Sequence, residues 1–446
     1  MTATPNGITT KTPSLFKETL FTLLIRGFVL VFALATSAIT ARVLGPDQNG
    51  TYNLIYLFIT TTSMLISCGI SPSNVYYGAR NAAEIPTILG NSMVAAVGLG
   101  LIGALAFFAA TFIPGVTAYL LENNIPLDWL RGIIFILPVV QLNSFMPDIL
   151  RASGRIRGYN LVTFLRQFIA LASLIPLFVL MAQKLDAALI AYVVGQCILA
   201  VLVIGFALRV TGRQVAFSRA ILSRHFRYGM RFQPSIIAQF LNYRLDVFLV
   251  GLFLTPAEVG FYALAALLAE RLWEIPNAIQ LILMVRVSAN NETAVPLTNQ
   301  ANRIIAALMA LICVGIALAS YPLILVVYGT DYLPMVSAFM LLVPGIWSLS
   351  IGKVLAAYVA GMGRPELATY SILSSLAVTV ILDLLLIPPF GINGASLTSS
   401  VSYTVYTAVL VFFYLRQTKT RLADLFIIRR DDMRLLRQHF GRLLRR

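Results

Sequence analysis

The sequence predicts an all-α polytopic membrane protein, with about twelve transmembrane helices arranged as two parallel six-helix repeats around a central cavity. Three observations lead to this prediction. Of the 446 residues, 59% are hydrophobic and 11% are charged, and the mean hydropathy is +0.84. A soluble domain, in contrast, carries about 25% charged residues. The apolar residues are grouped in long runs, and one sequence pattern recurs about 210 residues later.

The spans follow from the lengths of the apolar runs, because a helix needs about 20 apolar residues to cross the hydrocarbon core. Residues 1–19 are polar, and the first apolar run is too long for a signal peptide, so we expect no cleaved leader. The three cysteines are too few for a secreted disulfide-rich protein. The predicted spans cover residues 20–41, 51–70, 88–113, 129–147, 161–182, 186–208, 233–254, 259–285, 303–328, 333–358, 368–387 and 392–415.

Basic residues predict the orientation, since they are enriched in cytoplasmic loops. Twenty-five Lys and Arg residues lie on the side of the N-terminus or in the C-terminal tail, whereas three lie on the opposite side. Both termini are therefore expected in the cytoplasm. The net charge of +15 is then explained without a nucleic-acid partner. The predicted segments are a cytoplasmic N-terminal segment (1–19), a six-helix bundle (20–208), a basic cytoplasmic linker (209–232), a second six-helix bundle (233–415) and a basic cytoplasmic tail (416–446).

The tail and the linker have features of their own. Between Leu425 and Leu444, apolar residues recur near helical spacing with arginines between them. This pattern is typical of a basic amphipathic helix that lies on the anionic lipids of the inner leaflet, and a disordered basic tail is the alternative. His225 and His439 lie in basic cytoplasmic segments, where we expect both to face solvent.

An internal repeat relates the two predicted bundles. Residues 44–54 match residues 254–264 in Leu, Pro, Gly, Tyr and Leu at a shift of 210, and both segments join the first two spans of their bundle. A Gly-Arg pair at 154–155 recurs at 363–364, in the connection between the fourth and fifth spans. Because each bundle has an even number of spans, both begin on the same side of the membrane. The repeats should then be parallel, with the substrate path between them.

These segments resemble a known family. The hairpin from Ala41 to Tyr52, with Asn242–Asp246 and Gly260–Ala263, resembles bacterial polysaccharide and O-antigen (Wzx-type) flippases of the multidrug/oligosaccharidyl-lipid/polysaccharide (MOP) superfamily. The resemblance covers about residues 15–420. It implies alternating-access transport of an undecaprenyl-diphosphate-linked oligosaccharide across the bacterial cytoplasmic (inner) membrane, for surface polysaccharides such as lipopolysaccharide or exopolysaccharide.

The resemblance has further implications. It implies cavity cations that face the diphosphate of the lipid, and polysaccharide polymerase and chain-length proteins as further partners. The two additional C-terminal spans of lipid II flippases are absent from this chain, which argues against lipid II as the substrate.

Ionisable residues within the spans are the candidate functional residues, because a charge in a bilayer is costly unless it faces a cavity or a partner. Arg244 and Asp246 lie near the midplane, and their two-residue spacing places them on different helix faces, so each needs another partner. Glu270, Arg271 and Glu274 are also deep, with a structural intrahelical pair as the alternative. The candidate substrate-binding cations are Arg26, Arg244, Arg271 and Lys353; the candidate ion-coupling acids are Asp246, Glu270, Glu274 and Asp383; the candidate polar cavity residues are Ser37, Gln239, Asn242 and Asn277.

Some candidates have a simpler explanation. Arg26 and Lys353 are near enough to the membrane surface for their charged ends to reach it, and Asp383 is near enough to the outer end to be interfacial. Guanidinium groups bind phosphate oxygens in pairs, and a buried carboxylate can hold H⁺ or Na⁺ and change state during transport. Coupling to H⁺, to Na⁺ or to the membrane potential alone are the alternatives.

The remaining motifs argue against enzymic chemistry. We expect no catalytic residue, no metal site and no cofactor, because the sequence has neither a P-loop nor a metal-ligand spacing. Two other functions stay as alternatives to the flippase. One is a cation-coupled multidrug exporter of the same superfamily. The other is a membrane-embedded polysaccharide polymerase or ligase, which the short outer loops disfavour.

Overall fold

The computed structural model describes residues 15–289, 291–429 and 432. Throughout these residues the regular structure is helical, and they contain no strand. Among them, nine helices are long and apolar enough to cross a membrane. Two of the nine each hold two predicted spans, and one further predicted span is interrupted, so all twelve predicted spans have a helical counterpart. The prediction of an all-α polytopic membrane protein is confirmed.

The two longest helices are each bent at a glycine. Helix α1 (Leu15–Leu65) holds the first two predicted spans and leaves helical geometry at Gly45, with φ 71° and ψ 172°. A positive φ is readily adopted by glycine, and Pro46 then begins the next helical stretch with its φ already fixed. Helix α15 (Glu366–Thr418) holds the last two spans and bends at Gly391, with φ 57° and ψ −140°.

The eighth predicted span is not one continuous helix, so the prediction for residues 259–285 is wrong in this respect. The segment consists of α11 (Pro256–Glu270), a single 3-10 turn, η3 (Arg271–Trp273), and α12 (Glu274–Ala289). The break has a local cause in Pro276, which has no N–H to donate to the carbonyl four residues earlier. The chain tightens into a 3-10 turn at this point, and the turn separates Glu270 from Glu274.

The helices form two compact units that do not coincide with the predicted bundles. Residues 38–66 and 105–134, from the first half of the chain, group with the second half. The six-plus-six division therefore stays a prediction from the repeat. Of the described residues, unit 1 comprises 15–37, 67–104 and 135–231, and unit 2 comprises 38–66, 105–134, 232–289, 291–429 and 432.

Unit 1 is built around α6 and α8. Helix α8 packs on both α6 and α7, and α2 packs on α6 and α9. The core between them is apolar, with Phe145, Met146 and Ile149 of α6 fully buried. The helices of this unit are α2 (Ile70–Arg80), α3 (Ile85–Ala110, which continues into unit 2), α6 (Leu137–Ala152), α7 (Ile156–Leu180), α8 (Lys184–Val210) and α9 (Arg219–Gly229), with the 3-10 turn η1 (Ala82–Glu84).

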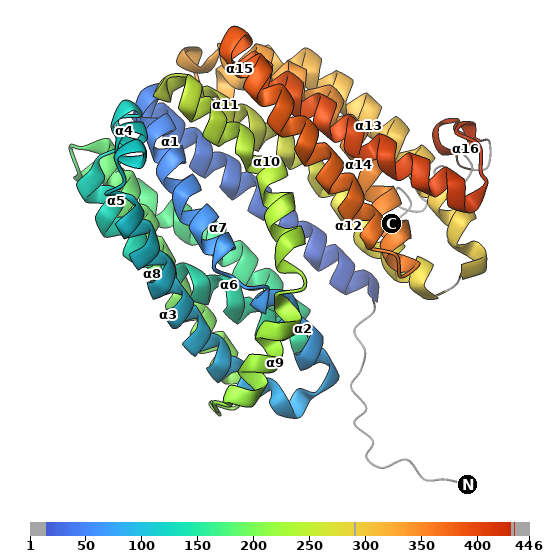
Figure 1. Cartoon of the computed structure of the whole chain (residues 1–446), viewed down its shortest axis with the longest axis horizontal. Helices are drawn as coiled ribbons and strands as arrows, with labels where there is room; N and C mark the ends of the chain where they lie inside the picture. Colours follow the sequence, from blue (N-terminus) through green and yellow to red (C-terminus); the bar gives the residue numbers. More distant parts are fainter. Residues whose placement is uncertain (1–14, 290, 430–431, 433–446) are drawn as a thin grey trace. The chain divides into compact units, whose positions relative to one another are not determined.

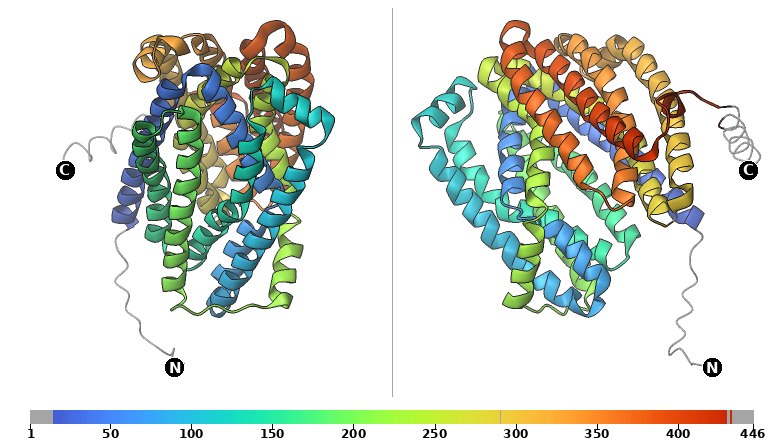
Figure 2. Two further views of the ribbon diagram at one scale, coloured as in Figure 1. Left: turned by 90° about the vertical axis from the view of Figure 1, so that its left-hand side faces the viewer. Right: turned by 45° about the vertical axis from the view of Figure 1, so that its right-hand side comes forward.

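Unit 2 is centred on α14, which contacts α11, α12, α13 and α15 and is mostly buried (Figures 1 and 2). Helix α10 packs on α15 and α11. The further helices of this unit are α4 (Pro114–Glu122), α5 (Leu127–Ile133), α10 (Gln233–Phe253), α13 (Asn291–Val327), α14 (Met335–Gly361) and the short α16 (Ala423–Phe426), with η4 (Thr330–Tyr332) and, at its border with unit 1, η2 (Ile134–Ile136).

The repeat predicted from the sequence has matching local geometry. Gly154 ends α6 and Gly363 ends α14, and both have a positive φ, 69° and 74°. The N–H of Arg155 donates to the carbonyl of Leu150 at 2.9 Å, and the N–H of Arg364 donates to the carbonyl of Val359 at 2.8 Å. The same glycine-terminated helix end thus recurs at the predicted shift.

The two repeated hairpins also touch each other in a reciprocal way. A Cβ on Gly50 would collide with the carbonyl oxygen of Pro256, and a Cβ on Gly260 would collide with that of Pro46. All four residues belong to unit 2. Only glycine allows backbones to approach this closely, so each hairpin places its glycine against the proline of the other.

The linker helix α9 is docked on α2 rather than exposed to solvent. A Cβ on Gly69 would meet the backbone of Gly229, and His225 stacks on Tyr77 with ring centroids 4.7 Å apart. His225 is 2% exposed. The expectation that His225 faces solvent is therefore wrong, because α9 turns its apolar face and this histidine toward α2. His439 lies outside the described residues.

The start of the C-terminal tail is anchored to α13. Asp432 accepts hydrogen bonds from Arg303 Nε (2.7 Å) and Nη2 (2.9 Å) and from Gln300 Nε2 (3.1 Å). The Arg303 and Asp432 side chains are 7% and 1% exposed, respectively. The chain is helical over α16 and extended at Ile427, and most of the predicted amphipathic helix lies outside the described residues.

Candidate functional site

Most predicted site residues lie in unit 2. Arg26 and Ser37 are on α1 in unit 1, where Arg26 is exposed and the Ser37 hydroxyl donates to the Leu34 carbonyl at 3.0 Å. The others are on α10, α11, η3, α12, α14 and α15 of unit 2. Polar side chains of unit 2 form three hydrogen-bonded groups, which we together call the unit 2 polar cluster: Arg244 with Glu270; Asp246 with Tyr262 and Ser399; and Asn242 with Ser375, Thr379 and Ser402.

Arg244 and Glu270 form a bidentate ion pair between α10 and the end of α11. The Nη1–Oε1 distance is 2.5 Å and the Nη2–Oε2 distance is 3.0 Å. The arginine side chain is 33% exposed and the glutamate side chain 17%. Glu270 therefore forms its ion pair with a residue of another helix, and not with Arg271 of its own segment. Arg244 does not pair with Asp246, as their spacing predicts.

Asp246 is 3% exposed, and its carboxylate is fully engaged. Its Oδ2 accepts two hydrogen bonds, one from the Tyr262 hydroxyl and one from the Ser399 hydroxyl at 3.0 Å. The other oxygen accepts the Val247 N–H at 2.8 Å. Three donors around one carboxylate are an arrangement that stabilises a negative charge in an apolar setting.

Asn242 lies one helical turn before Asp246 and connects α10 to α15. Its Oδ1 accepts hydrogen bonds from the Ser375 hydroxyl at 3.0 Å and the Thr379 hydroxyl at 3.3 Å. The Ser402 hydroxyl, beyond the Gly391 bend, lies 2.8 Å from that of Ser375. The two limbs of α15 are therefore joined by hydroxyl groups at this point.

Asp383 is fully buried on α15, with 0% exposure. Neither of its oxygens has a hydrogen-bond partner among the described residues. An isolated carboxylate in this environment is very unfavourable as an anion. A proton or a bound cation on Asp383 would remove this cost.

The cations outside the Arg244–Glu270 pair lie near the 3-10 break. Lys353 on α14 is half-buried, and its ammonium lies 5.1 Å from the ring centroid of Trp273. Arg271 is also half-buried, and its Nε has no hydrogen-bond partner among the described residues. Within that part of the chain, neither cation has an ion-pair partner. Gln239 and Glu274 are exposed, and Asn277 is half-buried.

The sequence reasoning missed the hydroxyl partners of the buried acids. On α15, Ser371, Ser375, Thr379 and Asp383 follow one another at four-residue spacing, and all are buried. This spacing places them on one helix face, so the stripe was visible in the sequence. In unit 1, Asp148 is buried as well, with the Ser71 hydroxyl and Arg151 as partners.

The charged side chains of unit 2 suit electrostatic binding of ions. No group of three or more His, Cys, Asp or Glu side chains is placed to hold a metal ion in the described ranges. The unit 2 polar cluster contains the Arg244–Glu270 ion pair and the buried Asp246. Unit 2 also holds Lys353 and Arg271, which form no salt bridge among the described residues, and the fully buried Asp383.

Sequence comparison identifies one matching family and one relative. The family described as "Polysaccharide biosynthesis protein" matches residues 39–337, which is more than half of the chain. The probable low-salt glycan biosynthesis flippase Agl15 of Haloferax volcanii is 25% identical over 190 residues. This match covers 41% of the chain and 40% of the relative, so the chain spans about two fifths of the relative's length in the aligned region.

Structural comparison shows the fold. The lipid II flippase MurJ, in an inward closed conformation, has a TM-score of 0.71 and 14% identity, covering 91% of this chain and 89% of that one. An inward-facing multidrug resistance MATE transporter of the MOP superfamily has a TM-score of 0.70 and 14% identity, covering 90% and 99%. A MOP transporter from Pyrococcus furiosus has a TM-score of 0.63 and 15% identity, covering 90% and 95%.

Proposed function

Because the chain belongs to the polysaccharide biosynthesis protein family and has a fold like those of a lipid II flippase and a MATE transporter, we propose that it is a flippase of the MOP superfamily for a lipid-linked oligosaccharide. The substrate would be an undecaprenyl-diphosphate-linked glycan, moved by alternating access across the bacterial inner membrane for a surface polysaccharide. Both termini would be cytoplasmic, and the chain would act as a transporter rather than an enzyme.

The observation that carries this proposal is that two cations of unit 2 form no salt bridge among the described residues, although Glu270 and Glu274 interact electrostatically with one of them, Lys353. Lys353 and Arg271 lie near the break in the eighth span, at positions where a charge needs a partner. A diphosphate is polyanionic, and phosphate oxygens are bound by guanidinium and ammonium groups. Both cations therefore suit the diphosphate of the lipid carrier.

Arg244 has a different role in this proposal. Its guanidinium is already held in a bidentate pair by Glu270, so it is not free to bind phosphate without breaking that pair. We assign it as a positioning residue, which ties α10 to the end of α11 beside η3. Arg26 in unit 1 stays a candidate cation.

The two buried acids are the proposed ion-coupling residues. Asp246 has three donors around it, whereas Asp383 has none among the described residues. A proton or Na⁺ on Asp383 would remove the cost of its buried charge. Release of that ion would bias the conformation, which is how an ion gradient drives transport.

The test is transport in proteoliposomes with a labelled undecaprenyl-diphosphate oligosaccharide in one leaflet. We expect Lys353→Gln to slow the movement of the labelled lipid by about tenfold, because the variant loses one charge-assisted contact with the diphosphate. Lys419→Gln, which removes the same charge after the end of α15, serves as the matched control. Equal rates in wild type and Lys353→Gln would refute the assignment of the site.

A cation-coupled exporter of small amphiphiles is the second candidate. The observation that favours it is the exposed Glu274, which directly follows η3, because an acid attracts cationic drugs. The same proteoliposomes decide between the two. Uptake of a cationic dye by wild type, without movement of the labelled lipid and with loss of uptake in Glu274→Gln, would support the exporter.

A further inference from the structure

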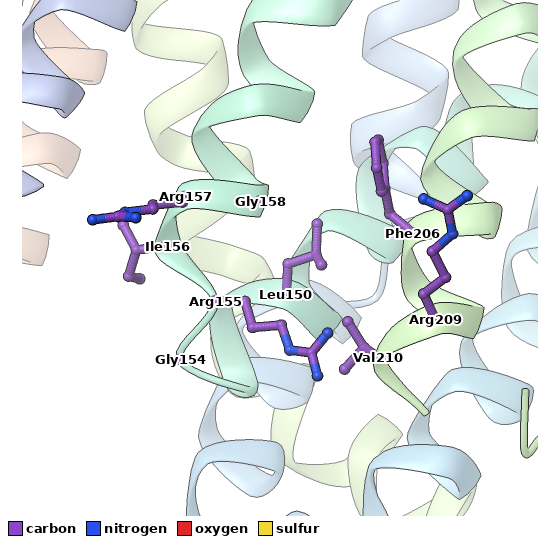
Figure 3. Close-up of a pocket in the computed structure, with 9 residues that line it drawn as sticks. All are labelled: Leu150, Gly154, Arg155, Ile156, Arg157, Gly158, Phe206, Arg209 and Val210. Atoms are coloured by element: carbon purple, nitrogen blue, oxygen red, sulfur yellow. The ribbon is translucent and has the colours of Figure 1, made fainter. Parts of the chain in front are cut away.

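A pocket of about 440 Å³ lies in unit 1, where α6, α7 and α8 meet at one end (Figure 3). Its lining is apolar on several sides, from Leu150, Ile156, Phe206 and Val210, and basic at Arg155, Arg157 and Arg209. In the view of Figure 3 the side chain of Arg155 extends toward Val210, while Arg157 is directed to the opposite side. A neighbouring pocket of about 390 Å³ is also lined by Arg155 and Val210, so Arg155 lines both pockets.

The pocket lies at the ends of candidate membrane spans. Three candidate membrane spans, Leu127–Ala152, Ile156–Leu180 and Lys184–Val210, all have an end at this pocket. The ends of membrane spans mark the boundary between hydrocarbon and headgroups. Ile156 is 48% exposed at this boundary, so an apolar surface and the two arginines adjoin each other at headgroup depth.

The two arginines are not neutralised by the protein. No acidic residue is among those that line the pocket. In the part of the chain that the structure describes, neither Arg155 nor Arg209 has an ion-pair partner. The nearby Asp148 of α6 is already bound by Ser71 and Arg151. The pocket therefore offers uncompensated positive charge beside an apolar wall.

We propose that this pocket binds the phosphate-bearing headgroup of a membrane lipid, with Arg155 and Arg209 on the phosphate and the apolar residues against the first part of the acyl or prenyl chains. Guanidinium groups match phosphate geometry, and arginines at a membrane surface attract anionic lipids. The site is in unit 1, whereas the polar cluster is in unit 2, so this proposal does not depend on the transport function proposed above.

The test is native mass spectrometry of the delipidated full chain in detergent, titrated with phosphatidylglycerol or phosphatidylcholine of equal chain length. We expect wild type to bind phosphatidylglycerol more tightly, and Arg155→Gln/Arg209→Gln to weaken that binding by about tenfold or more. Arg155→Lys/Arg209→Lys keeps the charge and should retain most of the binding, which guards against a folding defect in the first variant.

The repeat supplies a matched control. Arg364 is equivalent to Arg155 but faces Glu366 at 3.4 Å, and Arg416 lies in the last turn of α15 as Arg209 lies in that of α8. Arg364→Gln/Arg416→Gln removes the same two charges and should leave binding unchanged. Equal losses in both double variants would show that binding follows net charge alone and would overturn the proposal.

Further probes distinguish the source of the phosphate. An undecaprenyl diphosphate that displaces phosphatidylglycerol would support the proposal and identify the carrier lipid as a ligand of this pocket. Failure of the diphosphate to compete, with phosphatidylglycerol still bound, would support an ordinary phospholipid as the ligand. Displacement by inorganic phosphate at the same concentration as the lipid would overturn the proposal, because the apolar wall would then contribute nothing.

Discussion

The docking of α9 on α2 should depend on pH through His225. Burial, together with the nearby Arg224, lowers the pKa of His225 from 6.5 to about 4, and Glu84 opposes this shift. The other groups that face the ring are Tyr77, which stacks on it, and Asn74, whose Oδ1 lies 3.3 Å from Nδ1. His225 is therefore neutral in the folded protein at neutral pH.

The sign and size of the effect follow from the pKa. The unfolded chain binds a proton on His225 at a higher pH than the folded protein, so stability is fully present above pH 6.5 and decreases as the pH falls toward 4. The shift from 6.5 to about 4 corresponds to a maximal loss of about 3 kcal/mol. At pH 5.5 the loss is about 1.4 kcal/mol, which lowers Tm by about 1–2 °C in a chain of this length.

The assay is thermal unfolding of the detergent-purified chain at pH 7.5 and pH 5.5. His225→Gln cannot be protonated, so the decrease in Tm between the two pH values should be smaller in this variant than in wild type. His439→Gln removes the other histidine and is the matched control, which should respond as wild type does. An identical decrease in wild type and His225→Gln would refute the reasoning.

Three further predictions concern packing, the tail and coupling. Gly50→Ala should lower stability by about 1–3 kcal/mol because its Cβ meets backbone, whereas Gly98→Ala, which meets open space, should not; equal Tm values would contradict this. Asp432→Asn should lower the free energy of unfolding by about 2–3 kcal/mol, measured by thermal unfolding, because its ion pair with Arg303 is buried. Glu366→Gln removes a member of an exposed ion pair and should lower it by less than about 1 kcal/mol. Asp383→Asn should fold and bind substrate but lose the dependence of transport on an ion gradient, and an unchanged dependence would exclude this acid.

The helices could be predicted from the sequence because hydrophobic run length alone determines which segments cross a bilayer. The turns of the repeat could be predicted as well. Gly154 and Gly363 each end a helix with a positive φ. A helix end of this kind favours glycine for a local reason, because glycine adopts a positive φ without a steric penalty. The break at η3 was also visible in principle, since Pro276 removes one backbone donor.

The partners of the charged residues could not be predicted in the same way. Spacing showed that Arg244 and Asp246 point apart, but it does not show which helix supplies Glu270 or Ser399. Such partners come from residues 26 and 153 positions away, and they depend on how the helices pack. The same reason explains His225, whose burial depends on Tyr77 of a helix far earlier in the chain.

The reciprocal contact of the two hairpins has the form of an isologous interface, in which each partner offers the same surface to the other. Gly50 meets Pro256 and Gly260 meets Pro46. In a twofold dimer, likewise, residue i of each subunit meets residue j of the other subunit. The chain thus holds, inside one polypeptide, a self-complementary surface of the kind that two separate six-helix proteins would use to dimerise. Two fragments, split in the linker between α8 and α10, therefore have a matched pair of surfaces through which they can associate.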